Sequence, residues 1–374
     1  MTGVPDRVPL LAQLHEFAMQ ETRAAAREFY STPELLTVAT LKTHAKYGID
    51  VPVLDYDVYN IEAEAIGQAI RYSDTDMPDV DRSRPLIRDR DDLNKIRTPD
   101  FESDGRFRQV IEMNKLFRSL IGPGVDATVR FCAPFSLAAN IRGIEQLILD
   151  IYSAPQFARD LFDRITEELL APWIQRLQTE FPAAQRFSGD DATASLPIVN
   201  LDILENWIVP YIERLRELCG PQVCVPNWVG ESLLDNPTEM LDLKRRVCPG
   251  FLEGQDPDVE KLGPQFYKEY AQENGLPLIL GIGIDDGVHV VHDYLRQKGP
   301  FAISHSTASA LIITSATTMI GFGSMMFARH QGLRSLGQVL TIGVFCCLLS
   351  SLLVLPPLLR CLRPASQLEG EVVS

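Results

Sequence analysis

A repeated alternation of short apolar segments with amphipathic segments most constrains the fold of this chain. From about residue 9 to residue 274, runs rich in β-branched and aromatic residues precede stretches with helical periodicity. ATVRFCAPF and QRFSGDDA predict strands, and NLDILENWIVPYIERLRELC predicts a helix. Repeated strand–helix units of this size favour a parallel α/β fold, and a barrel fits better than an open sheet.

Charge divides the chain near residue 274. The whole chain carries 50 acidic and 35 basic residues, but residues 275–374 hold only five of the acidic and six of the basic ones. The acidic front argues against nucleic acid as a partner. The chain contains no GxGxxG or GxxxxGK[ST] motif, so no motif supports a nucleotide-binding function.

Two long uncharged segments follow this division. Residues 301–328 contain no charged side chain, and residues 336–362 contain none before Arg360. Each is long enough to cross a hydrocarbon core of about 30 Å, which takes about 20 helical residues. The alternative is a pair of buried helices in a large soluble domain.

Four segments of the front half are similar to a known enzyme superfamily. They are LDYDVYNIEAEAIG, APFSLAANIRGIEQLILDIYSAPQF, GDDATASLPIVNLDILENWIVPYI and FLEGQDPDVEKLGP. Together they resemble the uroporphyrinogen decarboxylase superfamily, which also contains corrinoid- and coenzyme M-type methyltransferases. The resemblance covers about residues 5–283 and implies a TIM-like (β/α)8 barrel with its cleft at the C-terminal ends of the strands. The chain leaves the family pattern near Gly281, so we expect the barrel to lack its last strand.

The resemblance also implies catalytic candidates. Asp57 lies where the decarboxylases carry an aspartate that binds pyrrole N–H groups and stabilises the cation of a protonated pyrrole. Asp191 matches a cleft position of the methyltransferase branch. The structural alternatives are a loop-capping role for Asp57 and a helix N-cap for Asp191. Glu62 and Glu64 are interpreted as residues of a helix's first turn, which the helix dipole favours.

Candidate substrate-binding residues are Arg23, Arg27 and Asn227. The decarboxylases' arginine-rich motif is absent, so Arg23 and Arg27 either meet substrate carboxylates or lie on solvated helix faces. NWVG at residues 227–230 replaces the His-x-Cys-Gly zinc motif of the methyltransferases. Because neither Asn nor Val supplies an imidazole or a thiolate, we predict no metal site, and no cofactor is expected. The expected partners are a tetrapyrrole or corrinoid-type small molecule and a second copy, in a homodimer formed through the barrel.

The back of the chain resembles an unrelated family. LPLILGIGIDDGVHVVHDYL, TSATTMIGFGSMMFARHQGLRSLG and VLPPLL are similar to the last three helices of RND transporters, in particular lipid and hopanoid exporters. The similarity covers about residues 276–363. It implies that Asp285 and Asp286 relay protons inside a membrane helix. At a helix–water boundary the two aspartates would instead cap a helix or face water.

These resemblances predict a barrel over residues 1–283, a junction with an amphipathic helix over 284–300, transporter-like transmembrane helices over 301–363 and a disordered tail over 364–374. We expect two spans, 301–327 and 336–359, in the lipid bilayer of the inner or plasma membrane. The count of flanking positive charges is compatible with a barrel on the cytoplasmic side.

The predicted function is that of a superfamily enzyme tethered to the membrane by a transporter-derived tail. Tetrapyrrole decarboxylation is the first reaction considered, and corrinoid-linked methyl transfer is the runner-up. Two alternatives stay open: a fragment or subunit of an RND-type transporter, and an inactive chimera.

Overall fold

The computed structural model describes residues 9–122 and 128–281 and, nearer the C-terminus, residues 312, 319, 341–342 and 344–357. The chain divides into two compact units, Met1–Ile282 and Gly283–Ser374. The first unit contains the strands and helices that carry the candidate site.

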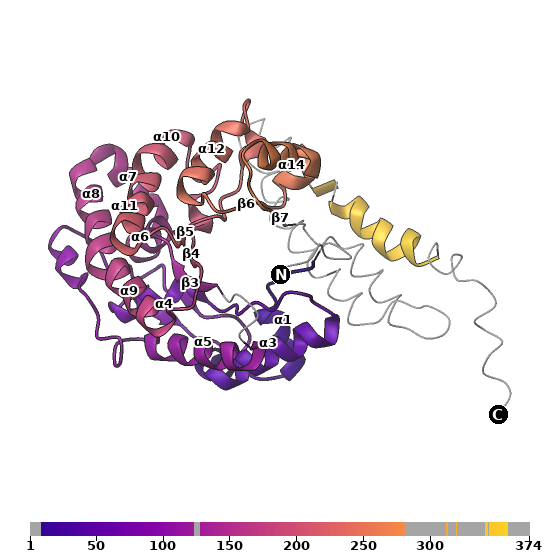
Figure 1. Cartoon of the computed structure of the whole chain (residues 1–374), viewed down its shortest axis with the longest axis horizontal. Helices are drawn as coiled ribbons and strands as arrows, with labels where there is room; N and C mark the ends of the chain where they lie inside the picture. The colour runs from indigo at the N-terminus through magenta and orange to yellow at the C-terminus, as the bar shows by residue number, and fades with distance from the viewer. Residues whose placement is uncertain are drawn as a thin grey trace. The chain divides into compact units, whose positions relative to one another are not determined.

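Parallel strands form the centre of the first unit (Figure 1). They are β3 (Val129–Cys132), β4 (Phe187–Asp190), β5 (Val223–Cys224), β6 (Leu252–Gly254) and β7 (Leu278–Leu280). β3, β4 and β5 pair in chain order, and β6 pairs with β7, with a parallel register throughout. Leu11 and Val51 add one further parallel bridge. Strands that pair in chain order, with helices between them, are typical of a TIM-like barrel.

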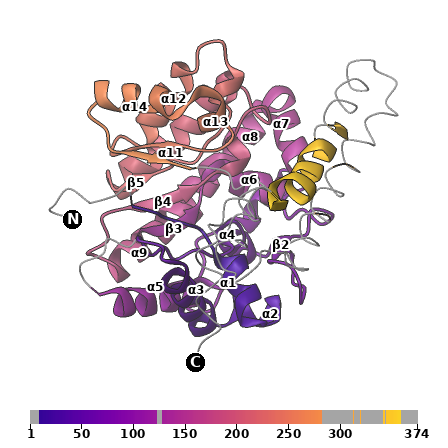
Figure 2. The ribbon, with the colours of Figure 1, turned by 90° about the vertical axis from the view of Figure 1, so that its right-hand side faces the viewer.

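Helices surround these strands. Figure 2 shows β3, β4 and β5 in the middle of the first unit, with α12 to α14 at one end and α1 to α3 at the other. The α-helices are α1 (His15–Thr22), α2 (Ala26–Ser31), α3 (Pro33–Tyr47), α4 (Val58–Ala65), α5 (Phe107–Ile121), α6 (Pro134–Arg142), α7 (Ile144–Ser153), α8 (Pro155–Arg164), α9 (Ala171–Glu180), α10 (Leu201–Ile203), α11 (Val209–Cys219), α12 (Thr238–Val247), α13 (Asp258–Leu262) and α14 (Pro264–Glu273).

Shorter elements complete the described residues. They are the antiparallel strands β1 (Ile70–Arg71) and β2 (Asp79–Val80), the 3-10 helices η1 (Asp91–Lys95), η3 (Ala192–Ala194) and η5 (Glu231–Leu233), and the π-helical turns η2 (Ile165–Leu170), η4 (Leu204–Ile208) and η6 (Ser350–Val354).

The apolar core lies between the strands and the surrounding helices. Phe131 on β3, Phe187 on β4 and Trp173 on α9 are completely or almost completely buried. Trp173 packs on Phe107 of α5, with 4.2 Å between the ring centroids. Burying one such side chain contributes about 1.5–3 kcal/mol, so this core holds the strands at fixed positions. The polar side chains at the strand ends are therefore placed on a rigid support.

The prediction of an α/β TIM-like fold is confirmed, but the prediction of a C-terminal transmembrane segment is wrong. In the part of the chain that the structure describes, no helix combines the length and the apolar character that crossing a membrane requires. The multi-pass membrane location is corrected for the same reason. Apart from residues 312 and 319, the first expected span lies outside the described residues.

Candidate functional site

Two parallel strands bring acidic residues to one edge of the sheet. Cys132 and Asp190 are register partners at the ends of β3 and β4. Parallel strands direct their carboxyl ends to the same edge, where α/β proteins carry their sites. Contacts from α4 and from the loop after β5 join this edge. We call Tyr59, Asp190, Asp191 and Asn227 the strand-end cluster.

Asp191 is fully buried and connects two loops. Its Oδ1 accepts a hydrogen bond of 2.8 Å from the Ser136 backbone N–H, in the first turn of α6. Its Oδ2 accepts one of 3.3 Å from Trp228 Nε1. Burial raises the pKa of Asp191 to about 6, and the hydrogen bonds from Ser136 oppose that rise. The side chain does not cap the 3-10 helix η3 that follows it, so it serves the start of α6 instead.

Asp190 is buried, and one of its oxygens has no partner. Oδ1 lies 3.4 Å from Asn227 Nδ2 and 3.6 Å from Arg130 Nη2. No hydrogen bond reaches Oδ2 within the described part of the chain. Burial raises the pKa of Asp190 to about 6, against the opposing effect of Arg130. Oδ2 can therefore hold or release a proton near neutral pH, as a general acid must.

Glu62 is a third buried carboxyl group near the same edge. Its Oε1 accepts a hydrogen bond of 3.1 Å from the Cys132 backbone N–H at the end of β3. Burial raises the pKa of Glu62 to about 8, so the group is neutral at pH 7. The first-turn interpretation of Glu62 and Glu64 is corrected, because both residues lie past the first turn of α4. Glu62 is fully buried, and Glu64 pairs with Arg106.

Asn227 links the other members of the strand-end cluster. Its Oδ1 accepts a hydrogen bond of 2.9 Å from the Asp191 backbone N–H, which leaves Nδ2 to face Tyr59 and Asp190. Both ends of the amide are therefore committed. Val229 has no donor atom at the cysteine position, the third, of the methyltransferase zinc motif. These residues do not fit a zinc ion, which takes imidazole and thiolate ligands.

A line of polar contacts runs from Asp190 to a pocket. Arg130 Nη1 lies 2.9 Å from Asp55 Oδ1, and Asp55 Oδ2 lies 3.4 Å from His15 Nε2. His15 Nδ1 lies 2.7 Å from the Tyr30 hydroxyl oxygen. His15 and Asp55 line a pocket of about 430 Å³. That volume is within the range of small-molecule sites.

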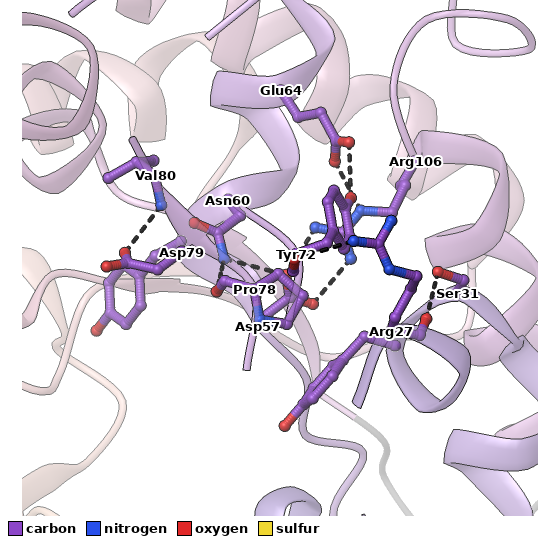
Figure 3. A network of polar contacts seen from close by, with 12 residues as sticks. Arg27, Ser31, Asp57, Asn60, Glu64, Tyr72, Pro78, Asp79, Val80 and Arg106 are labelled. Atoms are coloured by element: carbon purple, nitrogen blue, oxygen red, sulfur yellow. Dashed lines mark hydrogen bonds and ion pairs between the residues drawn. The ribbon is translucent and has the colours of Figure 1, made fainter. Parts of the chain in front are cut away.

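Asp57 belongs to a different network, shown in Figure 3. Its two oxygens accept hydrogen bonds of 3.0 and 2.6 Å from the Arg106 guanidinium, and Asn60 Nδ2 donates another of 3.0 Å. Arg106 also donates to Glu64 at 2.6 Å and lies over the Tyr72 ring. Bidentate arginine–carboxylate pairs are among the strong charge-assisted hydrogen bonds in proteins. The described contacts of Asp57 include none with the strand-end cluster.

The other predicted site residues lie in four different places. Asn227 is in the strand-end cluster, as described above. Arg23 ends α1 in the left-handed conformation, with φ of 58°. Arg27 has an exposed side chain that donates to the Tyr72 carbonyl at 3.0 Å. Asp285 and Asp286 lie outside the described residues.

Sequence reasoning missed Tyr59, Asp190, Glu62 and Arg130 as site residues. One signal was available: Arg130 is a charged residue inside the apolar run ATVRFCAPF. A charge in a buried strand needs partners in the interior and often marks a site. Asp190 directly precedes the predicted Asp191. Tyr59 and Glu62 carry no local signal, because their burial depends on tertiary contacts.

Comparisons with known proteins agree with the front-half resemblance. A family model described as uroporphyrinogen decarboxylase (URO-D) matches residues 2–225. A uroporphyrinogen decarboxylase of Anaeromyxobacter sp. is 22% identical over 313 residues, which cover 75% of this chain and 87% of that protein. A solved methyltransferase structure from Methanosarcina mazei has a TM-score of 0.57 and 20% identity, covering 75% of this chain and 89% of that chain. At this identity the structure shows a shared fold alone.

Two further relatives match over short segments. A protein of Methanocaldococcus jannaschii, named as a membrane protein, is 38% identical over 90 residues, or 22% of this chain. A hopanoid transporter of Burkholderia multivorans is 30% identical over 105 residues, or 27% of this chain. The chain spans 23% and 12% of the lengths of these two relatives. The transporter-like tail rests on these partial matches, and they do not show a fusion of two families.

Proposed function

The chain belongs to the uroporphyrinogen decarboxylase family, and on this basis we propose that it is a carboxy-lyase that removes side-chain carboxylates from a tetrapyrrole. One observation carries the proposal. Asp190 lies at the strand ends with a partner-free Oδ2 and a pKa of about 6. This is the proton donor that decarboxylation requires near neutral pH.

Decarboxylation replaces a carboxylate with a proton. The bond between the side-chain carbon and the carboxylate breaks, and carbon dioxide leaves. The electron pair of the broken bond stays on the carbon or in the attached ring. A proton must then form the new C–H bond, so one proton is consumed for each carbon dioxide released. We assign this proton to Asp190 Oδ2. Arg130 on one side and the neutral Glu62 nearby keep the site from accumulating further negative charge.

The two carboxylates predicted from sequence have other roles in this proposal. Asp191 fixes the loops after β3 and β5 through Ser136 and Trp228. Asp57 stabilises the first unit through its ion pair with Arg106. Both residues hold other groups in position, and we do not assign either of them as the donor of the proton that forms the new C–H bond.

The experiment compares wild type, Asp190→Asn and Asp163→Asn. Asp163 is an exposed residue of α8 whose carboxyl pKa is also raised, so it is a control away from the strand ends. Decarboxylation of uroporphyrinogen is followed by chromatography of the oxidised porphyrins. We expect activity in wild type and in Asp163→Asn, and a loss of about 10²–10⁴-fold in Asp190→Asn. An inactive wild type, or full activity in Asp190→Asn, would contradict the proposal.

Corrinoid-linked methyl transfer, the runner-up, is weaker because the zinc-motif positions hold Asn227 and Val229. Methyl transfer from methylcobalamin to a thiol, measured with and without added zinc, separates the two reactions. We expect the chain to show none.

A further inference from the structure

The Tyr59 hydroxyl is held by two loops that meet at the strand ends. Tyr59 lies in the first turn of α4, and its side chain is half-buried. The Ala192 backbone N–H donates to the phenol oxygen at 3.2 Å. Asn227 Nδ2 donates to the same oxygen at 3.4 Å. Each loop, one after β4 and one after β5, thus supplies a donor to one oxygen.

These two contacts determine the remaining hydrogen-bonding capacity of the Tyr59 hydroxyl. A phenol oxygen has two lone pairs and one proton. Both lone pairs of Tyr59 accept hydrogen bonds, and no residue in the described ranges accepts its proton. Burial and the nearby Asp190 raise the pKa of Tyr59 well above its usual value, so the proton stays on the oxygen. The hydroxyl is therefore a neutral donor whose proton has no acceptor among the described residues.

The orientation of this donor is fixed from several directions. The Asp191 backbone N–H donates to Asn227 Oδ1 at 2.9 Å, so the amide can only turn Nδ2 toward Tyr59. Asn140 Nδ2 donates to the Tyr59 carbonyl at 2.8 Å and holds the start of α4. Asn227 Nδ2 also lies 3.4 Å from Asp190 Oδ1. The phenol and the carboxyl group are therefore positioned by one amide.

We propose that Tyr59 donates a hydrogen bond to a carboxylate of the bound tetrapyrrole, beside Asp190, and that Asn227 is the positioning residue that holds it there. This inference rests on the proposed function and names the group that recognises the substrate. A neutral donor suits an anionic ligand in an acidic surrounding, because it adds no charge to the site. A site built to hydrogen-bond its ligand discriminates strongly once that bond is removed.

The variants are Tyr59→Phe, Asn227→Ala and the double variant, with Tyr270→Phe as the control. Tyr270 on α14 donates its hydroxyl to Asp242 at 2.7 Å, so the control removes a satisfied phenol outside the cluster. Binding of uroporphyrin is measured by quenching of tryptophan fluorescence, since Trp228 touches Asp191. The KM and kcat for uroporphyrinogen are measured in parallel.

We expect Tyr59→Phe to weaken uroporphyrin binding and raise KM about tenfold or more, with a smaller change in kcat. Asn227→Ala should give part of this loss of binding and rise in KM. It should add little in the Tyr59→Phe background, because both substitutions act on the same hydrogen bond to the substrate. Tyr270→Phe should match wild type.

The outcomes separate this inference from the proposed function. If wild type is active and Tyr59→Phe binds and turns over like wild type, the inference is wrong and the proposed function stands. If wild type is inactive yet binds uroporphyrin more tightly than Tyr59→Phe does, the proposed function fails and the Tyr59 donor stands. The inference is overturned if wild type binds no uroporphyrin. It is also overturned if the effects of Asn227→Ala and Tyr59→Phe on binding add fully in the double variant.

Discussion

Replacing Arg106 with methionine tests whether Asp57 serves the fold or the reaction. The Arg106 side chain is 8% exposed and the Asp57 side chain is 2% exposed. The guanidinium supplies two of the three hydrogen bonds that Asp57 accepts, at 3.0 and 2.6 Å. In Arg106→Met, Asp57 keeps only the hydrogen bond from Asn60. The variant therefore leaves the buried Asp57 carboxyl without a countercharge and also removes the ion pair of the partly exposed Glu64.

The expected loss of unfolding free energy is about 3–5 kcal/mol, the range for removing one partner of a buried ion pair. Methionine fills much of the space of the arginine stem, so the loss comes mainly from the uncompensated charge. Asp57→Leu in the same chain removes that charge. The double variant should therefore regain most of the stability that Arg106→Met loses, as replaced buried pairs commonly do.

Urea unfolding followed by far-ultraviolet circular dichroism measures both effects. Arg108→Met is the matched control, because Arg108 is exposed and pairs with Glu112 one helical turn away. Such a surface pair contributes about 0–1 kcal/mol. An unchanged urea midpoint in Arg106→Met, or a double variant no more stable than the single one, would refute the structural role of Asp57. A stable but inactive Asp57→Asn would assign Asp57 to the reaction.

Three further predictions follow from pKa values and from one glycine. The pKa of Glu62 is about 8 in the fold against 4.5 for a free carboxyl, so the native state binds the extra proton between these values. Stability should therefore fall by up to about 1.4 kcal/mol per pH unit as pH rises from 4.5 to 8, and Glu62→Gln should remove this slope in urea titrations. If protonated Asp190 is the donor, kcat/KM should fall about tenfold per pH unit above pH 6, and a flat profile from pH 6 to 8 would contradict that role. Gly230 has φ of 113°, and a Cβ there would lie 2.4 Å from the Leu196 Cβ, so Gly230→Ala should cost about 2–4 kcal/mol. The control is Gly275→Ala, at φ of 65° with open space around it, which should cost about 1 kcal/mol of stability. Equal losses of stability for the two variants in thermal unfolding would show that the contact with Leu196 is unimportant.

The strands of the first unit could be predicted because each is a short apolar run between helical segments. ATVRFCAPF contains β3, QRFSGDDA contains β4, and PGFLEGQ contains β6. The run DVPVLDYDVY also predicts a strand, but it forms only the bridge at Val51, and α4 begins within it at Val58. Two aspartates and a half-buried tyrosine at the end of this run belong to polar contacts that no local pattern reveals.

The site could be predicted only in part, since a carboxyl group's role depends on partners far away in the chain. The local pattern placed Asp191 after a strand, where it lies, but it placed Asp57 inside a strand, whereas Asp57 directly precedes α4. The partner of Asp57 is Arg106, 49 residues later, on the turn that begins α5. The partners of Asp191 come from α6 and from the loop after β5. Periodicity describes neighbours along one element and carries no information about such pairs.

Environment separates the acids of the first unit into two sets, and this separation indicates which one holds a transferable proton. Asp55 and Asp57 each lie within 3.0 Å of an arginine nitrogen. Glu62 and Asp190 are buried with weaker compensation, which raises the pKa of Glu62 to about 8 and that of Asp190 to about 6. Where titratable groups are pushed apart in this way, the charged members supply electrostatic stabilisation and the neutral members supply protons. Glu62 Oε2 and Asp190 Oδ2 both have no hydrogen-bond partner within the described residues. Glu62 Oε1 accepts from the Cys132 backbone at the end of β3, whereas Asp190 Oδ1 shares the Asn227 amide with the Tyr59 donor. In the proposed reaction, Asp190 is therefore the acid that lies with the Tyr59 donor on one amide, and its proton would go to the carbon that has lost carbon dioxide.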